Sequence, residues 1–114
     1  MRLGRGRVVR LDLGPVVGHE QAGIRPAVVV SDDAVAESQR FPLVAVVPLT
    51  RTPGRGLLYP TLDPGGSGLR EASFALCDQI RSVDKRRITR AYGSVSPAEL
   101  GEIDRGLGAY LGLR

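Results

Sequence analysis

Apolar and polar residues alternate near the start of the chain. In residues 6–13, GRVVRLDL, one face carries Val9, Leu11 and Leu13, whereas the other face includes an arginine and an aspartate. Alternation with a period of two is typical of a strand that buries one face. This segment therefore predicts a half-buried strand.

Two continuous apolar runs follow. Residues 26–31, PAVVVS, predict a strand buried on both faces, and residues 43–49, LVAVVPL, predict a second apolar strand. Because proline donates no backbone hydrogen bond, Pro26 fits only the first residue of a strand or an edge. The polar residues between the two runs, 32–42, suit a short helical turn.

The strand signals are weaker in the second half of the chain. Residues 57–63, LLYPTLD, predict a short strand that Pro60 weakens, and residues 72–79, ASFALCDQ, alternate again. The basic cluster DKRR, residues 84–87, predicts a surface turn or a short 3₁₀ segment. Residues 88–93, ITRAYG, predict the last strand.

Two loops between these strands are rich in glycine. RTPGRG covers residues 51–56 and is basic, and PGGSGLR covers residues 64–70 and forms a turn. Their composition predicts mobile segments.

The end of the chain has a helical period. Ser96, Pro97 and Glu99 form a capping-box pattern, with the serine as N-cap and the proline at the first helical position. Apolar residues then recur every three or four positions, which predicts an amphipathic helix of about 15 residues. The apolar face comprises Leu100, Ile103, Leu107 and Leu111. With about six strands before this helix, the pattern predicts a mainly β protein, a small curled antiparallel barrel with a C-terminal helix.

Length and composition are those of a small globular protein. The chain has 114 residues, 42% hydrophobic and 25% charged, so we expect a single domain over residues 1–114. Cys77 is the only cysteine, which excludes an internal disulfide and fits a reducing compartment. No apolar run approaches the ~20 residues of a membrane span, and the N-terminus lacks a signal-peptide pattern. We therefore expect a cytoplasmic protein without membrane contact.

The charge of the chain favours a nucleic-acid partner. The net charge is +4 with a pI of about 10.0, and the cations are 15 arginines and one lysine. Arginine presents a planar fork that suits phosphate. One histidine and one cysteine cannot build a zinc site of the usual spacing, and the sequence has no Walker loop, dinucleotide fingerprint or carboxylate set for Mg²⁺. An enzyme with this sequence is expected to work without a metal or a cofactor.

The segment GHEQAGIRP, residues 18–26, holds more polar chemistry than a turn requires. Arg25 precedes a proline, which holds it extended at the junction of loop and strand. Glu20 either pairs with Arg25 only to pin the loop, or orients Arg25 so that its charge stabilises a reacting phosphate. His19 either shuttles a proton near neutral pH or is simply solvated.

A second group of polar residues lies elsewhere in the chain. Thr50 ends an apolar strand, and its hydroxyl either caps a turn, which the pattern alone favours, or binds a phosphate oxygen. Arg51 and Arg55 follow it as solvated loop residues or as phosphate contacts. Gln79 either pairs with loop backbone or contacts a base edge.

Four segments, taken in order, resemble one protein family. They are GPVVGHEQAGIRPAVVVS, VVPLT, FALCDQIRSVDKRRI and SPAELGEIDRGLGAYLGL. From Arg5 to the terminal helix, the sequence resembles the MazF/PemK family of toxin endoribonucleases of type II toxin–antitoxin systems. The first segment and QIRSVDKRRI are the most specific parts of this resemblance.

The resemblance implies a fold, a chemistry and partners. The fold is an SH3-like barrel of the MazF/Kid/CcdB kind, in a homodimer whose RNA groove also takes the tail of a cognate antitoxin. The chemistry is sequence-specific cleavage of single-stranded RNA without a metal, in which the ribose 2′-OH attacks the adjacent phosphate. The products are a 2′,3′-cyclic phosphate and a 5′-hydroxyl. Apolar stretches such as LVAVV, with strand edges that a monomer would have to protect, also favour a dimer.

The resemblance also implies roles for individual residues. It puts the catalytic arginine on Arg25 and the catalytic threonine or serine on Thr50, and Glu20 matches the loop acid, which positions Arg25 and accepts the 2′-OH proton. At His19 the family often has serine, so this residue is assigned an auxiliary or RNA-contacting role. The residues expected to contact RNA are His19, Gln21, Arg51, Arg55, Gln79, Arg81 and Arg86.

Two other functions remain open from the sequence. One is a non-catalytic relative that inhibits a protein such as gyrase, as CcdB does, but the presence of IRP together with PLT argues against it. The other is a basic barrel that only holds RNA. Such modules usually display clustered aromatic residues for stacking, whereas this chain is 4% aromatic and its aromatic residues are scattered.

Overall fold

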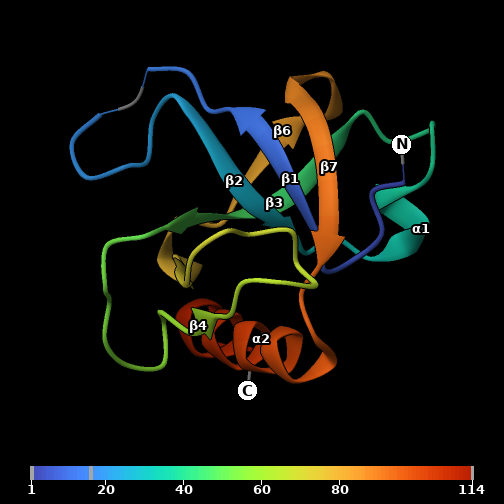
Figure 1. The fold of residues 1–114 in the computed structure, drawn as a ribbon. Coiled ribbons are helices and arrows are strands. Elements are labelled where there is room, and N and C mark those ends of the chain that lie inside the picture. Colours follow the sequence, from blue (N-terminus) through green and yellow to red (C-terminus); the bar gives the residue numbers. More distant parts are fainter. Residues whose placement is uncertain (1, 16, 114) are drawn as a thin grey trace.

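A curled antiparallel sheet packed against a C-terminal helix forms the structure. The computed structural model describes residues 2–15 and 17–113 (Figure 1). Its strands are β1 Arg7–Asp12, β2 Ile24–Val29, β3 Leu43–Thr50, β4 Thr61–Leu62, β5 Ser73–Ala75, β6 Arg81–Asp84 and β7 Ile88–Ser94. Its helices are α1 Asp33–Ala36 and α2 Pro97–Leu111, with 3₁₀ turns at Cys77–Gln79 and Lys85–Arg87. The predicted mainly β antiparallel fold with a C-terminal helix is confirmed.

Strand β3 is central to the sheet. The strand order is β4-β5-β3-β2-β1-β7, and β6 pairs with β3 outside this path. β3 pairs with β2 around its middle, with β6 through Leu43–Val46, and with β5 through Leu49 and Thr50. Since β3 has hydrogen-bonded partners on both sides, the expectation that LVAVV offers a free edge is wrong.

The apolar run of β2 is buried on both faces, as its sequence predicts. Ala27 and Val29 belong to one hydrophobic cluster, which includes Leu11 of β1. Val28 belongs to a second cluster, which includes Ile103 of α2. Helix α2 lies across this side of the sheet (Figure 1), so the alternating residues of β2 join two cores.

Two predicted strands are shorter in the structure, and one strand was missed. The predicted strand over 57–63 is reduced to β4, because a turn in which Tyr59 N–H donates to Gly56 O takes its first half. The predicted strand over 72–79 ends with β5, where the chain enters the 3₁₀ turn. Strand β6 was not predicted, because Val83 is its one buried residue and a single apolar position shows no period.

The loop over residues 64–70, which its composition predicts to be mobile, packs against β7. Gly93 N–H donates to Ser67 O at 3.1 Å, and Ser67 is only 3% exposed. A Cβ on Gly93 would lie 1.9 Å from the carbonyl oxygen of Gly66. The glycines of this loop and of β7 therefore allow a close crossing of two backbones.

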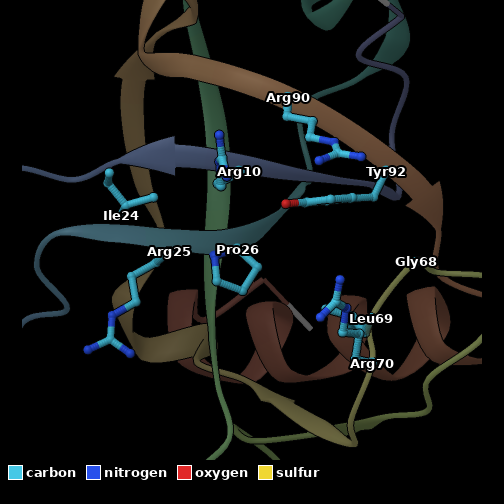
Figure 2. A pocket seen from close by; sticks show the side chains of 9 residues that line it. All are labelled: Arg10, Ile24, Arg25, Pro26, Gly68, Leu69, Arg70, Arg90 and Tyr92. Atoms are coloured by element: carbon cyan, nitrogen blue, oxygen red, sulfur yellow. The ribbon is translucent and has the colours of Figure 1, made fainter.

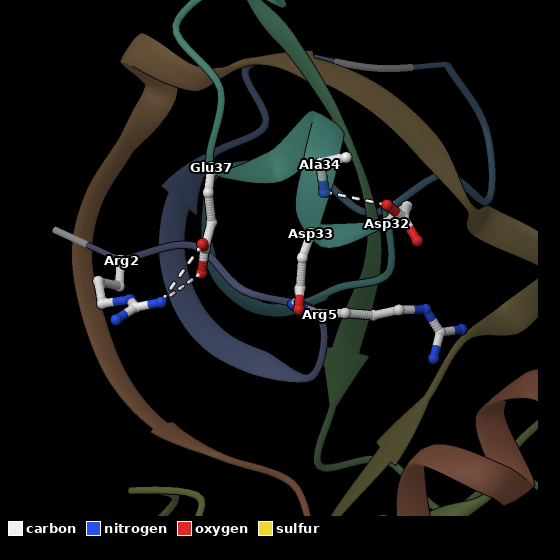
Figure 3. A network of polar contacts seen from close by, with 6 residues as sticks. All are labelled: Arg2, Arg5, Asp32, Asp33, Ala34 and Glu37. Carbon is white, nitrogen blue, oxygen red and sulfur yellow. Dashed lines mark hydrogen bonds and ion pairs between the residues drawn. The ribbon is translucent and has the colours of Figure 1, made fainter.

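A network of ion pairs ties the N-terminal segment to α1 and α2. Arg2 pairs with Glu37 at 3.3 Å, and Asp33 accepts the backbone N–H of Arg5 at 2.6 Å (Figure 3). The guanidinium of Arg5 reaches Asp104 of α2. These arginines are thus neutralised by carboxylates of the same chain.

Helix α2 begins and ends as its sequence predicts. Ser96 and Glu99 form the capping box, with N–H···O distances of 3.1 Å and 2.8 Å. The apolar face is buried at Ile103 and Leu107, whereas Leu111 is 47% exposed at the last turn. In the described part of the chain, no helix is long and apolar enough to cross a bilayer.

Gly106 lets α2 approach the 3₁₀ turn closely, and this contact gives a stability prediction. A Cβ at this position would lie 2.8 Å from Cys77 Sγ and 2.8 Å from the carbonyl oxygen of Leu57. We expect Gly106→Ala to lower the free energy of unfolding by about 1–3 kcal/mol in urea denaturation, although alanine is the better helix former.

Gly101 is the matched control, because it lies in the same helix with open space around its Cα. Gly101→Ala should raise the free energy of unfolding by up to about 1 kcal/mol. If both alanine variants were stabilised, the close approach at Gly106 would not be a real constraint.

Candidate active site

Arg25 and Thr50 belong to neighbouring strands, just beyond the point where these strands pair. β2 and β3 pair antiparallel up to Ala27 and Pro48. Beyond this pair, Arg25 is in register with Leu11 of β1 and Thr50 with Phe74 of β5. Both side chains line one cavity of about 420 Å³, called here the Arg25–Thr50 cavity.

Pro26 lies where β2 separates from β3. The strand begins at Ile24, so Pro26 is its third residue and not its first. Between Ile24 and Pro26 the strand pairs only with β1, and its pairing with β3 starts at Ala27. Pro26 therefore occupies a local edge, which is one of the two positions that its sequence context allowed.

The guanidinium of Arg25 is held at one end and available at the other. Its Nε donates to the carbonyl oxygen of Ala22 at 3.2 Å, and within the described residues its two terminal nitrogens have no partner. The predicted pair with Glu20 is not formed, because the Glu20 carboxylate accepts the backbone N–H of Val17 at 3.2 Å instead. Arg25 is exposed, so its fork can meet a phosphate bidentately.

The hydroxyl of Thr50 caps a turn. Its Oγ1 accepts the backbone N–H of Thr52 at 3.1 Å, which confirms the turn-capping alternative. A hydroxyl that accepts one bond still has a proton to donate, and within the described residues this proton has no acceptor. Capping the turn therefore fixes the oxygen of Thr50 and leaves its proton for a ligand.

The sequence interpretation missed three polar residues of this cavity. Arg70, Glu71 and Ser73 line it, from the end of the 64–70 loop and the start of β5. Glu71 pairs at 3.2 Å with Arg51, which was predicted and also lines the cavity. The only available signal was the arginine that ends PGGSGLR, which was interpreted as part of a plain turn.

Gln79 fixes the loop that precedes Arg25. Its Oε1 accepts the backbone N–H of Gln21 at 2.6 Å, and its Nε2 donates to the carbonyl oxygen of His19 at 3.2 Å. This confirms the loop-backbone alternative for Gln79. A smaller cavity of about 150 Å³ beside it is also lined by Glu20 and Arg81, so four predicted residues meet there.

The two hydrogen bonds of Gln79 predict that this side chain keeps the loop before Arg25 ordered. We expect Gln79→Ala to speed hydrogen exchange of the Gln21 amide about five- to tenfold, because a bond to a part-buried group contributes about 1–1.5 kcal/mol. Gln39→Ala, at an exposed glutamine near α1, is the control and should leave this exchange rate unchanged. Equal exchange rates of the Gln21 amide in both variants would contradict this role of Gln79.

Two predicted arginines lie apart from both cavities. Arg86 binds Asp84 at 3.0 Å, and its hydrogen bonds lower the pKa of Asp84 to about 2. Arg55 is exposed in the loop after β3. The structure therefore brings neither side chain to the candidate site.

The remaining titratable groups do not add a nucleophile or a metal site. Burial raises the pKa of the Cys77 thiol to about 11, so this sulfur stays protonated at neutral pH. Tyr59 donates to Asp78 at 2.7 Å, a bond that raises the tyrosine pKa. Across residues 2–15 and 17–113, the His, Cys, Asp and Glu side chains form no group of three that could hold a metal ion.

Arg25 and Thr50 line one arginine-rich cavity and keep hydrogen-bond donors for a ligand, and the curled sheet that carries them is that of a known class of small toxins. Residues 4–111 match the family of PemK-like, MazF-like toxins of type II toxin–antitoxin systems. The chain belongs to this family.

Individual relatives support this assignment over nearly the whole length. Endoribonuclease MazF9 of Mycobacterium tuberculosis is 37% identical in an alignment of 115 positions that covers 96% of each chain. The crystal structure of MazF from Deinococcus radiodurans has a TM-score of 0.78 at 33% identity and 96% coverage of both chains. An endoribonuclease of a mycobacterial species, solved in complex with its cognate antitoxin, has a TM-score of 0.79 at 27% identity, over 97% of this chain and 96% of that one. The protein is therefore an enzyme of the MazF endoribonuclease type.

Proposed function

We propose that the protein is a sequence-specific, metal-independent endoribonuclease that cleaves single-stranded RNA through the ribose 2′-OH. The observation that carries this proposal is that Arg25 and Thr50 line one cavity. Both residues hold their positions through hydrogen bonds to the backbone, and both keep donors for a ligand. Such donors suit the charge that develops on a phosphate during the reaction.

The reaction forms one bond and breaks one bond at phosphorus. The 2′-oxygen attacks the adjacent phosphate while the bond to the 5′-oxygen breaks, which gives a 2′,3′-cyclic phosphate and a 5′-hydroxyl. The Arg25 fork stabilises the negative charge on the pentacoordinate phosphorane, and Thr50 donates to one of its non-bridging oxygens. The 2′-OH proton leaves to a base, and the departing 5′-oxygen gains a proton.

Glu20 is the proposed acceptor of the 2′-OH proton. Glu20 lies in the loop that Gln79 holds in place. Its carboxylate accepts a hydrogen bond from the Val17 amide, and it has to give up this bond to reach the substrate. The further proposed contacts to RNA are His19, Gln21, Arg51, Arg55, Gln79, Arg81 and Arg86. For Gln79 the contacts described here support an indirect role, in which it positions the loop.

A homodimer, a cognate antitoxin and a cytoplasmic location are part of the same proposal. Exposed apolar side chains, among them Leu43 at 52% and Leu113 at 76% exposure, are surface that a second copy of the chain could cover. An antitoxin is supported by the mycobacterial relative, which was solved with its own. The arginine-lined cavities suit an acidic antitoxin tail as well as RNA.

Cleavage of a long single-stranded RNA in excess EDTA tests the proposed function. We expect defined cuts whose downstream fragments carry 5′-hydroxyl ends, and the mapped ends give the recognition sequence directly. An absence of cuts by folded protein would overturn the proposal and favour the inhibitor of a protein target. Binding without cuts would favour a barrel that only holds RNA.

A further inference from the structure

A second cavity lies beside the Arg25–Thr50 cavity. It has a volume of about 460 Å³ and is lined by Arg10, Arg90 and Tyr92, together with Arg25 and Arg70 (Figure 2). Arg25 and Arg70 line both cavities. The two cavities therefore form one continuous basic surface around the start of β2, and four arginines line the second cavity.

The charge of these four arginines is not balanced within the chain. Arg10 of β1 lies directly opposite Arg90 of β7 in the strand register, and like charges in this position destabilise a sheet. Within the described residues, none of the four pairs with a carboxylate, whereas the arginines of the N-terminal network all do. A fold that keeps an unfavourable cluster of one charge is typical of a site for a ligand of opposite charge.

The second cavity is also built to hold its side chains in place. The Arg90 guanidinium lies over the ring of Tyr92, 5.2 Å from the ring centroid, and the ring extends toward Arg10 (Figure 2). Arg10 Nε donates to Thr89 Oγ1 at 3.2 Å. Gly68 packs so closely on Tyr92 that a Cβ there would lie 2.7 Å from the tyrosine Cβ. The arginines are therefore oriented before any ligand binds.

We infer that this second cavity, lined by Arg10 and Arg90, is a second phosphate subsite, which binds the phosphodiester next to the scissile one on the same RNA strand. This inference rests on the proposed function and deepens it. The wall that the two cavities share offers a path along which a strand with its reacting phosphate beside Arg25 and Thr50 can continue into this cavity. Phosphate contacts of this kind fix the register of a strand and carry no sequence information themselves.

The test compares wild-type protein with the double variant Arg10→Gln/Arg90→Gln on an oligonucleotide that contains the mapped cut. We expect kcat/KM to fall at least about tenfold, because hydrogen bonds to charged groups are the strong ones. The slope of log kcat/KM against log salt concentration should become shallower by about 0.7 for the lost phosphate contact on a single strand. The melting temperature should stay the same or rise, because a like-charge pair is removed.

A neutral methylphosphonate placed at each phosphate in turn locates the contact. A methylphosphonate at one phosphate adjacent to the cut should slow cleavage by the wild type. At the same phosphate it should cause no further loss of kcat/KM in the double variant. Arg40→Gln is the matched control, since Arg40 is an exposed arginine that lies 5.9 Å from the ring centroid of Phe41 and lines neither cavity. It should leave kcat/KM unchanged.

Three results would overturn the inference while leaving the proposed function intact. These are unchanged kcat/KM in the double variant, a loss equal to that of Arg40→Gln, and a loss that follows a change in oligomeric state on size-exclusion chromatography. Failure of the wild type to cleave RNA at all would instead contradict the proposed function itself.

Discussion

Replacing Arg25 by alanine is expected to reduce RNA cleavage about a thousandfold, the largest effect of any single substitution in this protein. The variant loses the guanidinium that lines one cavity with Thr50, and with it the charge proposed to stabilise the reacting phosphate. Since Arg25 is exposed and donates only to one loop carbonyl, its removal should leave the fold intact. Single-turnover cleavage of an oligonucleotide with the mapped cut measures the rate, and thermal melting checks the fold.

Arg25→Lys separates the charge from the geometry of the fork. Lysine keeps the charge but provides a point donor, so we expect its rate to lie between those of the wild type and the alanine variant. Near wild-type cleavage by Arg25→Ala would mean that the chemistry occurs elsewhere on the molecule.

Replacing Thr50 by alanine should have the second largest effect, a loss of about a hundredfold in the cleavage rate. The hydroxyl is the donor expected to contact a non-bridging oxygen, and the same oxygen accepts the amide of Thr52. Thr50→Ala therefore loses both the donor and the cap of the turn. Single-turnover rates at saturating enzyme distinguish this loss from a weaker affinity for RNA.

Thr50→Ser is the control that keeps the hydroxyl and removes only a methyl group. It should retain most of the wild-type rate if the hydroxyl acts on the phosphate. A second variant, Thr52→Pro, keeps the hydroxyl of Thr50 but removes the amide that fixes it. Its loss of activity measures how much the capped turn contributes, and full activity would show that the cap is not needed for cleavage.

Local patterns were sufficient for the parts of the fold that depend on local physics. The continuous apolar run of β2 and the capping box of α2 each specify one structure, because burial on two faces and reciprocal capping bonds leave few alternatives. The sequence did not indicate β6, whose order comes from pairing with Leu43–Val46 of β3 and not from its own pattern. The packing of the 64–70 loop was not predicted for the same reason, since its contacts with β7 are distant in sequence.

In the candidate site too, the sequence predicted what depends on local context and not what depends on contacts between distant segments. Arg25 and Thr50 were found because each lies next to an apolar strand in a context that fixes its backbone. The expected Glu20–Arg25 pair is absent, because nearby backbone groups offer both side chains closer partners, at Val17 and Ala22. The Arg10–Arg90 juxtaposition depends on the register of two strands that are far apart in the chain, and no spacing in the sequence reveals it.

The most direct test of the central claim is a single 2′-deoxy substitution at the nucleotide just upstream of the mapped cut. If Arg25 and Thr50 stabilise attack by the 2′-oxygen, the wild-type protein should bind this oligonucleotide with nearly unchanged affinity and fail to cleave it. Deoxy substitution at the neighbouring nucleotides should leave cleavage at this bond in place. Cleavage of the deoxy-substituted bond at the normal rate would show that another nucleophile attacks the phosphate, and would contradict the proposed mechanism.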